Sequence, residues 1–576
     1  MERQNSIQGR VLYLVLLQAL LYVMWPGLAR ASAERPDAGG CSERAAEVSL
    51  SPNGLEVAEL MSPSPVGCMP ERITLVPIAR AGAQARTLVR SKGISQVSWV
   101  NDSTIAYVSG SLGDALDTVD LRTNRGKMVA RAPGPIMQYI VDPAGRRVEY
   151  MYRVWGGRSD YVSRRVTERL STKALILPHW ASFYGREYAV RAVPLYETLA
   201  SGTEVATAEY VSTLWIRQLA WLGELPVVLG QAGPSSPWKA SVMDLARHRT
   251  IVSAREFPFI RQIAGNQSGS IAVASFGGAA DTGMFPSFEP LHLWVVRPGG
   301  SVKEIAHFSP VDLSRLWWAP GDLLWAQIAT GEPFDDQRLV AIDPKSGRVI
   351  RTIRWPHGSL KDCQMNEDRT IALCAAETLT QSKRFVRVDL RSQRIATVSL
   401  PGVRTRALGL SFSQLTVRNK FGHVSSGFLA LPEGVQANSG QKEPVPLVIM
   451  LYGFNRVFAA HGQWVGAYPV RKLVKSGIAV LLLNFPYAPS WRRGDTTMAR
   501  RVMLEGPLST LESAPQAVEE AGFRVGRVMV MGWSRGGLVA AQAIQQSCKF
   551  VAAEVGDPAA WNVTAYALEN DEYRNF

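Results

Sequence analysis

The sequence predicts two folded domains: an all-β propeller, followed by an α/β domain whose parallel sheet carries helices on both faces. Two observations predict this division. Short turn motifs recur between apolar runs from about residue 70 to residue 410, which is typical of the small sheets that form propeller blades. Beyond residue 410 the apolar runs are continuous and alternate with helical segments, as in a parallel sheet that is buried on both faces.

The overall composition is that of a globular protein. The chain has 576 residues, 46% of them hydrophobic and 19% charged, so it can bury large cores and is not a disordered chain. Its 63 basic and 49 acidic residues give a formal net charge of +14. These charges are spread along the chain and do not form a basic stripe or tail, so we expect no nucleic-acid partner.

Residues 1–33 are predicted to be a cleavable signal peptide. Arg3 and Arg10 precede the apolar stretch Val11–Trp25, and Ala31-Ser32-Ala33 has the small-x-small pattern of a cleavage site. The alternative is an uncleaved anchor, but the apolar stretch is shorter than the ~20 residues of a membrane-spanning helix. We therefore expect a periplasmic or secreted protein without stable membrane insertion after cleavage.

The cysteines indicate disulfide bonds and no metal site. The chain contains Cys41, Cys68, Cys363, Cys374 and Cys548. Cys363 and Cys374 flank a turn-like stretch, so two strands joined there would bring their sulfurs within bonding distance. We expect this bridge and a second one between Cys41 and Cys68, with Cys548 left free. The spacings match no zinc site, and no cofactor is expected.

Residues 34–410 are assigned to the propeller because two patterns recur in them. In the first, an aspartate ends an apolar strand and a polar turn follows, at Asp120, Asp244, Asp343 and Asp389. In the second, a turn precedes a β-branched or aromatic run, at residues 99–103, 141–145, 318–322 and 365–368. A period of ~40–50 residues is typical of propeller blades. The length of the segment then predicts seven or eight four-stranded blades, with an array of β-sandwiches as the alternative.

Residues 411–576 are assigned to the α/β domain. Strand pairs are expected over 408–431. The predicted elements that follow are a strand at Pro446–Leu451, a helix at Val470–Lys475, a strand at Ile478–Leu483, a helix at about Pro515–Ala521, a strand at Val528–Met531, a helix at Gly537–Gln546 and a strand at Phe550–Val555. This alternation of apolar strands and helices predicts a parallel sheet.

The motif Gly532-Trp533-Ser534-Arg535-Gly536 lies between a predicted strand and a predicted helix. This G-x-S-x-G context is that of the nucleophile elbow of α/β-hydrolases, where glycines, here with Gly537, allow a sharp turn that exposes the serine. Ser534 is therefore the predicted nucleophile. The backbone N–H of Arg535 is one predicted donor to the oxyanion, and a second donor is expected near Tyr452, after an earlier strand.

Together these motifs resemble the prolyl oligopeptidase family of serine peptidases, over nearly the whole mature chain. The likeness rests on Leu451-Tyr452-Gly453, on the elbow from Gly532 to Gly537, and on Asn484-Phe485-Pro486 after a buried strand. It implies that the Tyr452 hydroxyl donates to the oxyanion and that the propeller admits peptides to the active site. The alternative for Tyr452 is a packing role at the end of its strand.

Within that family, three features look most like the lasso peptide isopeptidases. These are the signal peptide, the Cys363–Cys374 hairpin and the tract Ala467-Tyr468-Pro469-Val470. The resemblance implies hydrolysis of the side-chain amide that closes the ring of a lasso peptide. Dipeptidyl and acylaminoacyl peptidases share the architecture and remain alternatives. A propeller-based binding protein with an inactive hydrolase domain is the alternative from another functional class.

The catalytic triad is expected to be incomplete in this chain. In α/β-hydrolases the order is Ser, then Asp or Glu, then His, whereas all seven histidines precede Ser534: His179, His248, His292, His307, His357, His423 and His461. Asp557 is read as a turn residue or a displaced acid. We therefore expect a hydrolase domain that is truncated after the nucleophile helix and the next strand, and that is inactive as given. The alternative is a natural pseudoenzyme.

Overall fold

The structure is a computed structural model that describes residues 42–556 with gaps. The longest gaps are 154–187, 195–207, 277–289, 453–468 and 487–496, and Ser534 is a gap of one residue. Of two compact units, the larger comprises Arg44–Ser62 and Pro70–Phe576. The predicted signal peptide and the predicted Cys41–Cys68 bridge lie outside the described residues. Among the described helices, none is long and apolar enough to cross a membrane.

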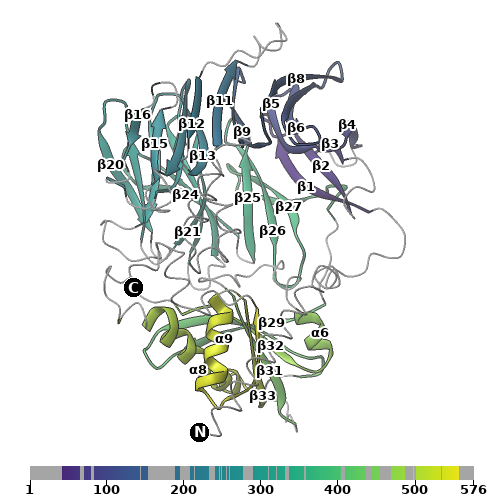
Figure 1. The fold of residues 1–576 in the computed structure, drawn as a ribbon, viewed down its shortest axis with the longest axis vertical. Coiled ribbons are helices and arrows are strands. Elements are labelled where there is room, and N and C mark those ends of the chain that lie inside the picture. Colours follow the sequence, from purple (N-terminus) through teal and green to yellow (C-terminus); the bar gives the residue numbers. More distant parts are fainter. Residues whose placement is uncertain are drawn as a thin grey trace, which may run out of the picture. The chain divides into compact units, whose positions relative to one another are not determined.

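The first part of the chain forms seven four-stranded sheets, each made of consecutive strands (Figure 1). Sheets one to three comprise β1 (Ser42–Leu50), β2 (Glu56–Ser64), β3 (Glu71–Pro77) and β4 (Arg86–Ser91); β5 (Ser95–Asn101), β6 (Thr104–Ser109), β7 (Ala115–Asp120) and β8 (Arg125–Arg131); and β9 (Ile136–Val141), β10 (Arg147–Arg153), β11 (Tyr188–Pro194) and β12 (Ala208–Ser212).

Sheets four to seven follow the same order. They comprise β13 (Trp215–Leu222), β14 (Leu225–Gln231), β15 (Ala240–Asp244) and β16 (Arg249–Val252); β17 (Ile260–Gly265), β18 (Ile271–Phe276), β19 (Leu291–Val296) and β20 (Val302–Phe308); β21 (Val311–Ala319), β22 (Leu323–Thr330), β23 (Asp336–Ile342) and β24 (Val349–Trp355); and β25 (Ser359–Met365), β26 (Ile371–Glu377), β27 (Arg384–Asp389) and β28 (Ile395–Val398). The predicted propeller is thus present.

The recurring aspartates occupy one position in their sheets. Asp120, Asp244 and Asp389 end the third strand, and Asp343 directly follows one. The Asp389 carboxylate accepts the backbone N–H groups of Arg391 and Ser392 at 3.0 and 2.8 Å, which closes the turn to the fourth strand. The second sequence pattern falls on the turns between first and second strands. Both patterns are therefore turn chemistry, as the sequence predicted.

Seven apolar clusters join neighbouring sheets, and the series closes on itself. Each cluster is shared by two consecutive sheets, in order from one to seven. The last cluster joins sheet seven to sheet one, where Leu373 and Phe385 pack with Leu50 and Val57. Sheets one and seven share no strand, so side-chain packing and hydrogen bonds hold this closing seam together.

Hydrogen bonds between the first strands of neighbouring sheets reinforce the ring; we call them inter-sheet clasps. Gln218 of β13 donates to the carbonyl of Ile263 in β17 at 2.8 Å and accepts its N–H at 3.0 Å. Gln364 of β25 makes the same pair across the closing seam, with the Val48 carbonyl at 2.7 Å and the Leu50 N–H at 2.9 Å. Single clasps involve Glu47 with Val97, Gln96 with Ile136, and Arg315 with Cys363.

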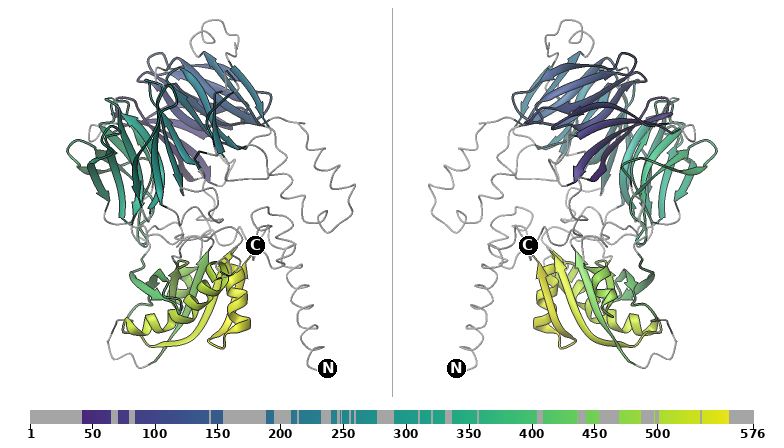
Figure 2. Two further views of the ribbon diagram at one scale, coloured as in Figure 1. Left: turned by 90° about the vertical axis from the view of Figure 1, so that its left-hand side faces the viewer. Right: turned by 90° about the vertical axis from the view of Figure 1, so that its right-hand side faces the viewer.

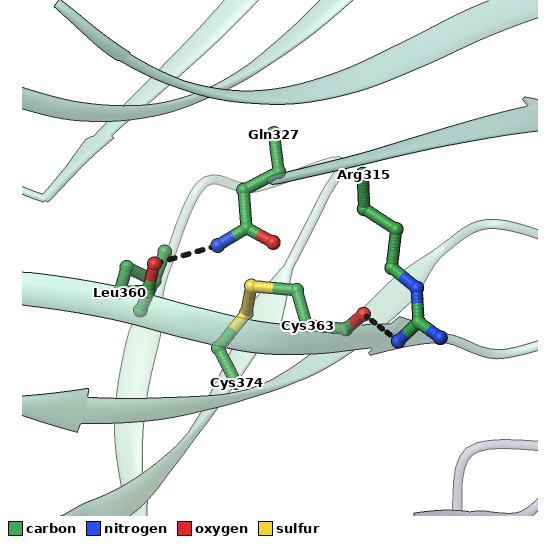
Figure 3. The surroundings of a disulfide bond; sticks show 5 residues. All are labelled: Arg315, Gln327, Leu360, Cys363 and Cys374. Carbon is green, nitrogen blue, oxygen red and sulfur yellow. Dashed lines mark hydrogen bonds between the residues drawn. A yellow bond between two sulfur atoms is a disulfide. The ribbon is translucent and has the colours of Figure 1, made fainter. Parts of the chain in front are cut away.

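The predicted Cys363–Cys374 disulfide is present and links β25 to β26 in sheet seven (Figure 3). The two Cα atoms are 4.0 Å apart, and both cysteines are fully buried. Gln327 donates to the Leu360 carbonyl beside the bridge at 2.6 Å. Cys548 is free and exposed, as expected. Among the described residues, no cluster of three or more His, Cys, Asp or Glu side chains could hold a metal ion.

The second part of the chain forms a six-stranded sheet in the order β29-β30-β32-β31-β33-β34. Its strands are β29 (Phe412–Arg418), β30 (Val424–Ala430), β31 (Val445–Tyr452), β32 (Ala479–Leu483), β33 (Val525–Trp533) and β34 (Phe550–Gly556). β29 and β30 are antiparallel to their neighbours, and the other four strands are parallel. The predicted strands of this domain are all present, and β34 is mostly half-buried or exposed.

Helices cover both faces of this sheet, as predicted. Helix α6 (Val470–Lys475) packs on one face, with Val470 and Val474 buried against Met450. Helices α8 (Gly506–Glu520) and α9 (Arg535–Gln546) pack on the other, through residues that include Leu511 and Val539. Figure 2 shows α8 and α9 together on one side of the sheet.

The predicted start of the helix that precedes β33 was wrong. A helix was expected from about Pro515, but α8 begins at Gly506 and Pro515 lies inside it. Pro507 occupies the first turn, where a missing N–H costs nothing. Buried Leu511 packs on the sheet together with Ala514 and Val518. This packing keeps the segment helical across Pro515. A π-helix, η2 (Arg501–Glu505), precedes it.

Candidate active site

The G-x-S-x-G motif lies at a junction between strand and helix. β33 ends at Trp533 and α9 begins at Arg535, so Ser534 is the single residue between them; it lies outside the described residues. In the register of the sheet, Trp533 is paired with Tyr452 at the end of β31 and with Gly556 at the end of β34. These are carboxyl ends of parallel strands, where open α/β sheets bind their ligands.

Close backbone contact at this junction requires the glycines of the motif. A Cβ atom on Gly532 would lie 2.1 Å from the carbonyl oxygen of Gly536 and 2.7 Å from the nitrogen of Gly537. No side chain fits there, so the first turn of α9 passes directly over the end of β33. This is the sharp strand-to-helix turn that a nucleophile elbow requires. Gly532, Trp533, Gly536 and Gly537 therefore lie where a strand meets a helix; their role as a nucleophile elbow stays a prediction.

Arg535 opens α9 with a buried side chain. It is 3% exposed, and its Cζ atom lies 4.7 Å from the centroid of the Phe485 ring. The first backbone N–H groups of a helix have no acceptor within the helix. The Arg535 N–H therefore donates to no carbonyl of α9. Its role as an oxyanion donor remains a prediction, as does the role of Tyr452, whose side chain lies outside the described residues.

The described histidines do not adjoin the elbow within the six-stranded sheet. His423 lies in the turn between β29 and β30, and burial together with the Arg501 guanidinium lowers its pKa. β30 is separated from β33 by β32 and β31, which places them three strand spacings, roughly 14 Å, apart. His292 and His307 belong to sheet five, where His292 pairs with Glu304 at 2.7 Å. His461 and Asp557 lie outside the described residues.

Sequence reasoning assigned no role to Phe485, which the structure places against the elbow. The residue follows β32 and is 3% exposed. The sequence signal was available, because an aromatic residue directly after a buried parallel strand must lie at its carboxyl end. Its contact with Arg535 could not be read from the sequence, because that contact depends on the spatial order of β32, β31 and β33.

Comparisons with known proteins give a likeness of fold. A scan against protein-family models found no match, and neither did a search of curated proteins. The acylaminoacyl peptidase of Pyrococcus horikoshii is similar with a TM-score of 0.65 and 14% identity, over 92% of this chain and 83% of its own. The AtxE2 isopeptidase has a TM-score of 0.55 and 18% identity, over 89% and 76%. A variant of it with Astexin3-dC4 bound has 0.53 and 17%, over 92% and 81%.

These similarities show the architecture alone, a propeller followed by an α/β-hydrolase domain. At these levels of identity they do not establish activity or substrate. The chemistry must therefore be argued from the elbow itself.

Proposed function

We propose that this chain is a serine peptidase of prolyl oligopeptidase type, which acts on peptides through an acyl-enzyme. The observation that carries the proposal is the close approach of Gly532 to the Gly536 carbonyl. A Cβ atom on Gly532 would lie 2.1 Å from that carbonyl oxygen. A turn this tight, between a parallel strand and a helix, has one familiar use: it presents the intervening residue, here Ser534, as a nucleophile.

Each residue of the site has a chemical role in this proposal. The Ser534 hydroxyl attacks the carbonyl carbon, and the bond to the leaving amine breaks once that amine is protonated. The Arg535 N–H and the Tyr452 hydroxyl stabilise the negative oxygen of the tetrahedral intermediate. A general base must accept the serine proton, because a serine hydroxyl is a weak nucleophile at its ordinary pKa. The described residues do not supply that base at the elbow.

The finer proposal concerns the substrate, which we infer to be the isopeptide bond of a lasso peptide. The Cys363–Cys374 hairpin and the tract that ends at Val470 support it, together with the likeness to the AtxE2 isopeptidase. An acylaminoacyl or dipeptidyl specificity is the alternative, since the P. horikoshii acylaminoacyl peptidase shares the architecture. We also propose export to the periplasm or beyond, on the signal peptide of residues 1–33.

Labelling with a fluorophosphonate tests the reaction class. The protein expressed from its complete gene should be labelled at Ser534, with the site identified by peptide mass spectrometry. Ser534→Ala should abolish the label, and Ser547→Ala, a serine just beyond the end of α9, serves as the matched control. Absence of any label would favour the inactive propeller-based binding protein.

A panel of peptides tests the substrate class. Enzyme that has not been treated with the probe is offered a lasso peptide, its unthreaded branched isomer, an N-acylated peptide and a linear peptide with a free N-terminus. Hydrolysis of the side-chain amide, detected by mass spectrometry as the addition of one water molecule with opening of the ring, supports the isopeptidase proposal. Faster release of the acylated residue from the third peptide would support the alternative.

A further inference from the structure

We infer that Phe485 is a positioning residue for the nucleophile elbow. Its ring holds the guanidinium of Arg535 and thereby fixes the first turn of α9, whose N–H is proposed to bind the oxyanion. The catalytic consequence rests on the proposed function; the structural part does not.

The contact between the two side chains is short and shielded from water. The Arg535 Cζ atom is 4.7 Å from the ring centroid, within the range of a cation–π interaction, and such interactions strengthen when they are desolvated. Arg535 and Phe485 are each 3% exposed. The pair is therefore a buried contact and not a transient surface pairing.

The first turn of a helix is an unfavourable position for a cation. The N-terminus of a helix carries partial positive charge, so a cation in the first turn is repelled. The first turn of α9 contains no acidic residue, and burial adds a desolvation cost. Departures from local physical preference concentrate at functional sites. The stack on Phe485 offsets part of this cost.

Phe485 is itself held by residues outside α9. Asn484, next to it, is 2% exposed; its N–H donates to the Ser426 carbonyl and its Nδ2 to the Ser426 hydroxyl, both at 3.0 Å. Leu483 is paired with Gly427 in the register of the sheet. The ring is thus anchored to β30 and β32, so it can act as a fixed reference for the elbow.

The sheet order gives this contact its importance. Phe485 follows β32 and Arg535 follows β33, while β31, which ends at Tyr452, runs between them. The two side chains together therefore span two strand spacings, roughly 10 Å, across the end of β31. Through this link the carboxyl end of β32 and the start of α9, whose N–H is one proposed oxyanion donor, are held in one arrangement.

Substitutions at Phe485 separate a positioning role from simple packing. In the protein expressed from its complete gene, Phe485→Leu removes the π face, whereas Phe485→Trp keeps it. We expect Phe485→Leu to lower kcat on an activated ester about tenfold with little change in KM, since a displaced oxyanion donor acts on the transition state. Phe485→Trp should restore most of the rate. The control is Phe523→Leu, a buried phenylalanine of the same core in the connection between α8 and β33.

Hydrogen exchange provides a readout that is independent of activity. The amides of Val539 and Ala540 bond to carbonyls of the first turn of α9, so they should exchange faster in Phe485→Leu than in Phe523→Leu. If Phe485→Leu does not fold, Arg535→Met, which removes the charge and keeps a long side chain, should show the same faster exchange.

The outcomes distinguish this inference from the proposed function. No label at Ser534 in the wild type removes the proposed function, and exchange then decides the structural inference alone. If labelling occurs, but Phe485→Leu and Phe523→Leu give equal kcat and equal exchange at Val539, then Phe485 is only a packing residue and the inference is overturned.

Discussion

Gly532 is the residue on which the geometry of the elbow depends most directly. Gly532→Ala would place a Cβ atom 2.1 Å from the Gly536 carbonyl oxygen. We expect it to lower the free energy of unfolding by about 2–3 kcal/mol and to abolish labelling of Ser534. Gly526→Ala is the control in the same strand, because its Cβ would lie 3.3 Å from the nearest atom. Chemical denaturation measures both variants; equal effects would contradict the tight-turn interpretation.

Tyr452 can be tested by removing a single oxygen. If its hydroxyl donates to the oxyanion, Tyr452→Phe in the protein from the complete gene should lower kcat about 10²–10³-fold, with KM nearly unchanged. The variant keeps the aromatic ring and removes only the hydroxyl group. Steady-state kinetics with an activated ester gives both constants. An unchanged kcat would return Tyr452 to a packing role.

Glu149 is a buried carboxyl group without a hydrogen-bond partner among the described residues. It is fully buried in β10, and neither side-chain oxygen has a partner. Strand alternation places it on the face of Met151, toward sheet four. The nearby cation, Arg147, lies 3.6 Å from Asp142 and over the Trp221 ring. Burial therefore raises the pKa of Glu149 well above its usual value.

This raised pKa predicts how stability changes with pH. Because the folded-state pKa exceeds the unfolded value, the contribution of Glu149 is most favourable below the unfolded pKa of 4.5 and declines as the pH rises toward the folded pKa. Glu149→Gln should therefore raise Tm by ~2–4 °C at pH 8 and leave it nearly unchanged at pH 4.5. Thermal unfolding at both pH values measures this; an equal shift at each would mean that ionisation plays no part.

At the scale of elements, the Cys363–Cys374 bridge offers the clearest test. It closes a loop with a sequence separation of 11 residues. Replacing both cysteines by alanine should lower the free energy of unfolding by about 2–3 kcal/mol in the chain-entropy estimate. Cys548→Ser, at the exposed free cysteine, is the control and should have no effect. Thiol labelling of the unreduced protein should find one or two reactive cysteines; finding all five would contradict the bridge.

Elements with a strong local signal could be predicted from the sequence. Helix α6 matches its predicted range, Val470–Lys475, and the turn between Cys363 and Cys374 predicted their pairing. α8 was predicted to start too late because Pro515 resembles a first-turn proline, while the packing of Leu511 that carries the helix past it is tertiary. The inter-sheet clasps were missed because a glutamine in a strand gives no periodic signal and the spacing from one sheet to the next is unequal.

At the scale of the whole molecule, the prediction that the triad is incomplete within residues 34–576 can be tested with that segment. All seven histidines precede Ser534 in the sequence, and β30, which begins next to His423, lies three strand spacings, roughly 14 Å, from β33. We expect this segment to show no Ser534-dependent turnover of an activated ester. The comparison is the same segment carrying Ser534→Ala, assayed in parallel. Turnover that depends on Ser534 would show that a histidine upstream of the nucleophile acts as the base.

The closing seam also sets a waiting time during synthesis. The Leu50 N–H finds its acceptor on Gln364, 314 residues later in the chain, and Leu50 and Val57 pack against Leu373 and Phe385 of the same late sheet. At ~5–20 residues per second, ribosomes need about 15–60 s to make that stretch. For this interval the apolar residues of sheet one that belong to the closing seam have no native partner, and they remain exposed until the last blade is made.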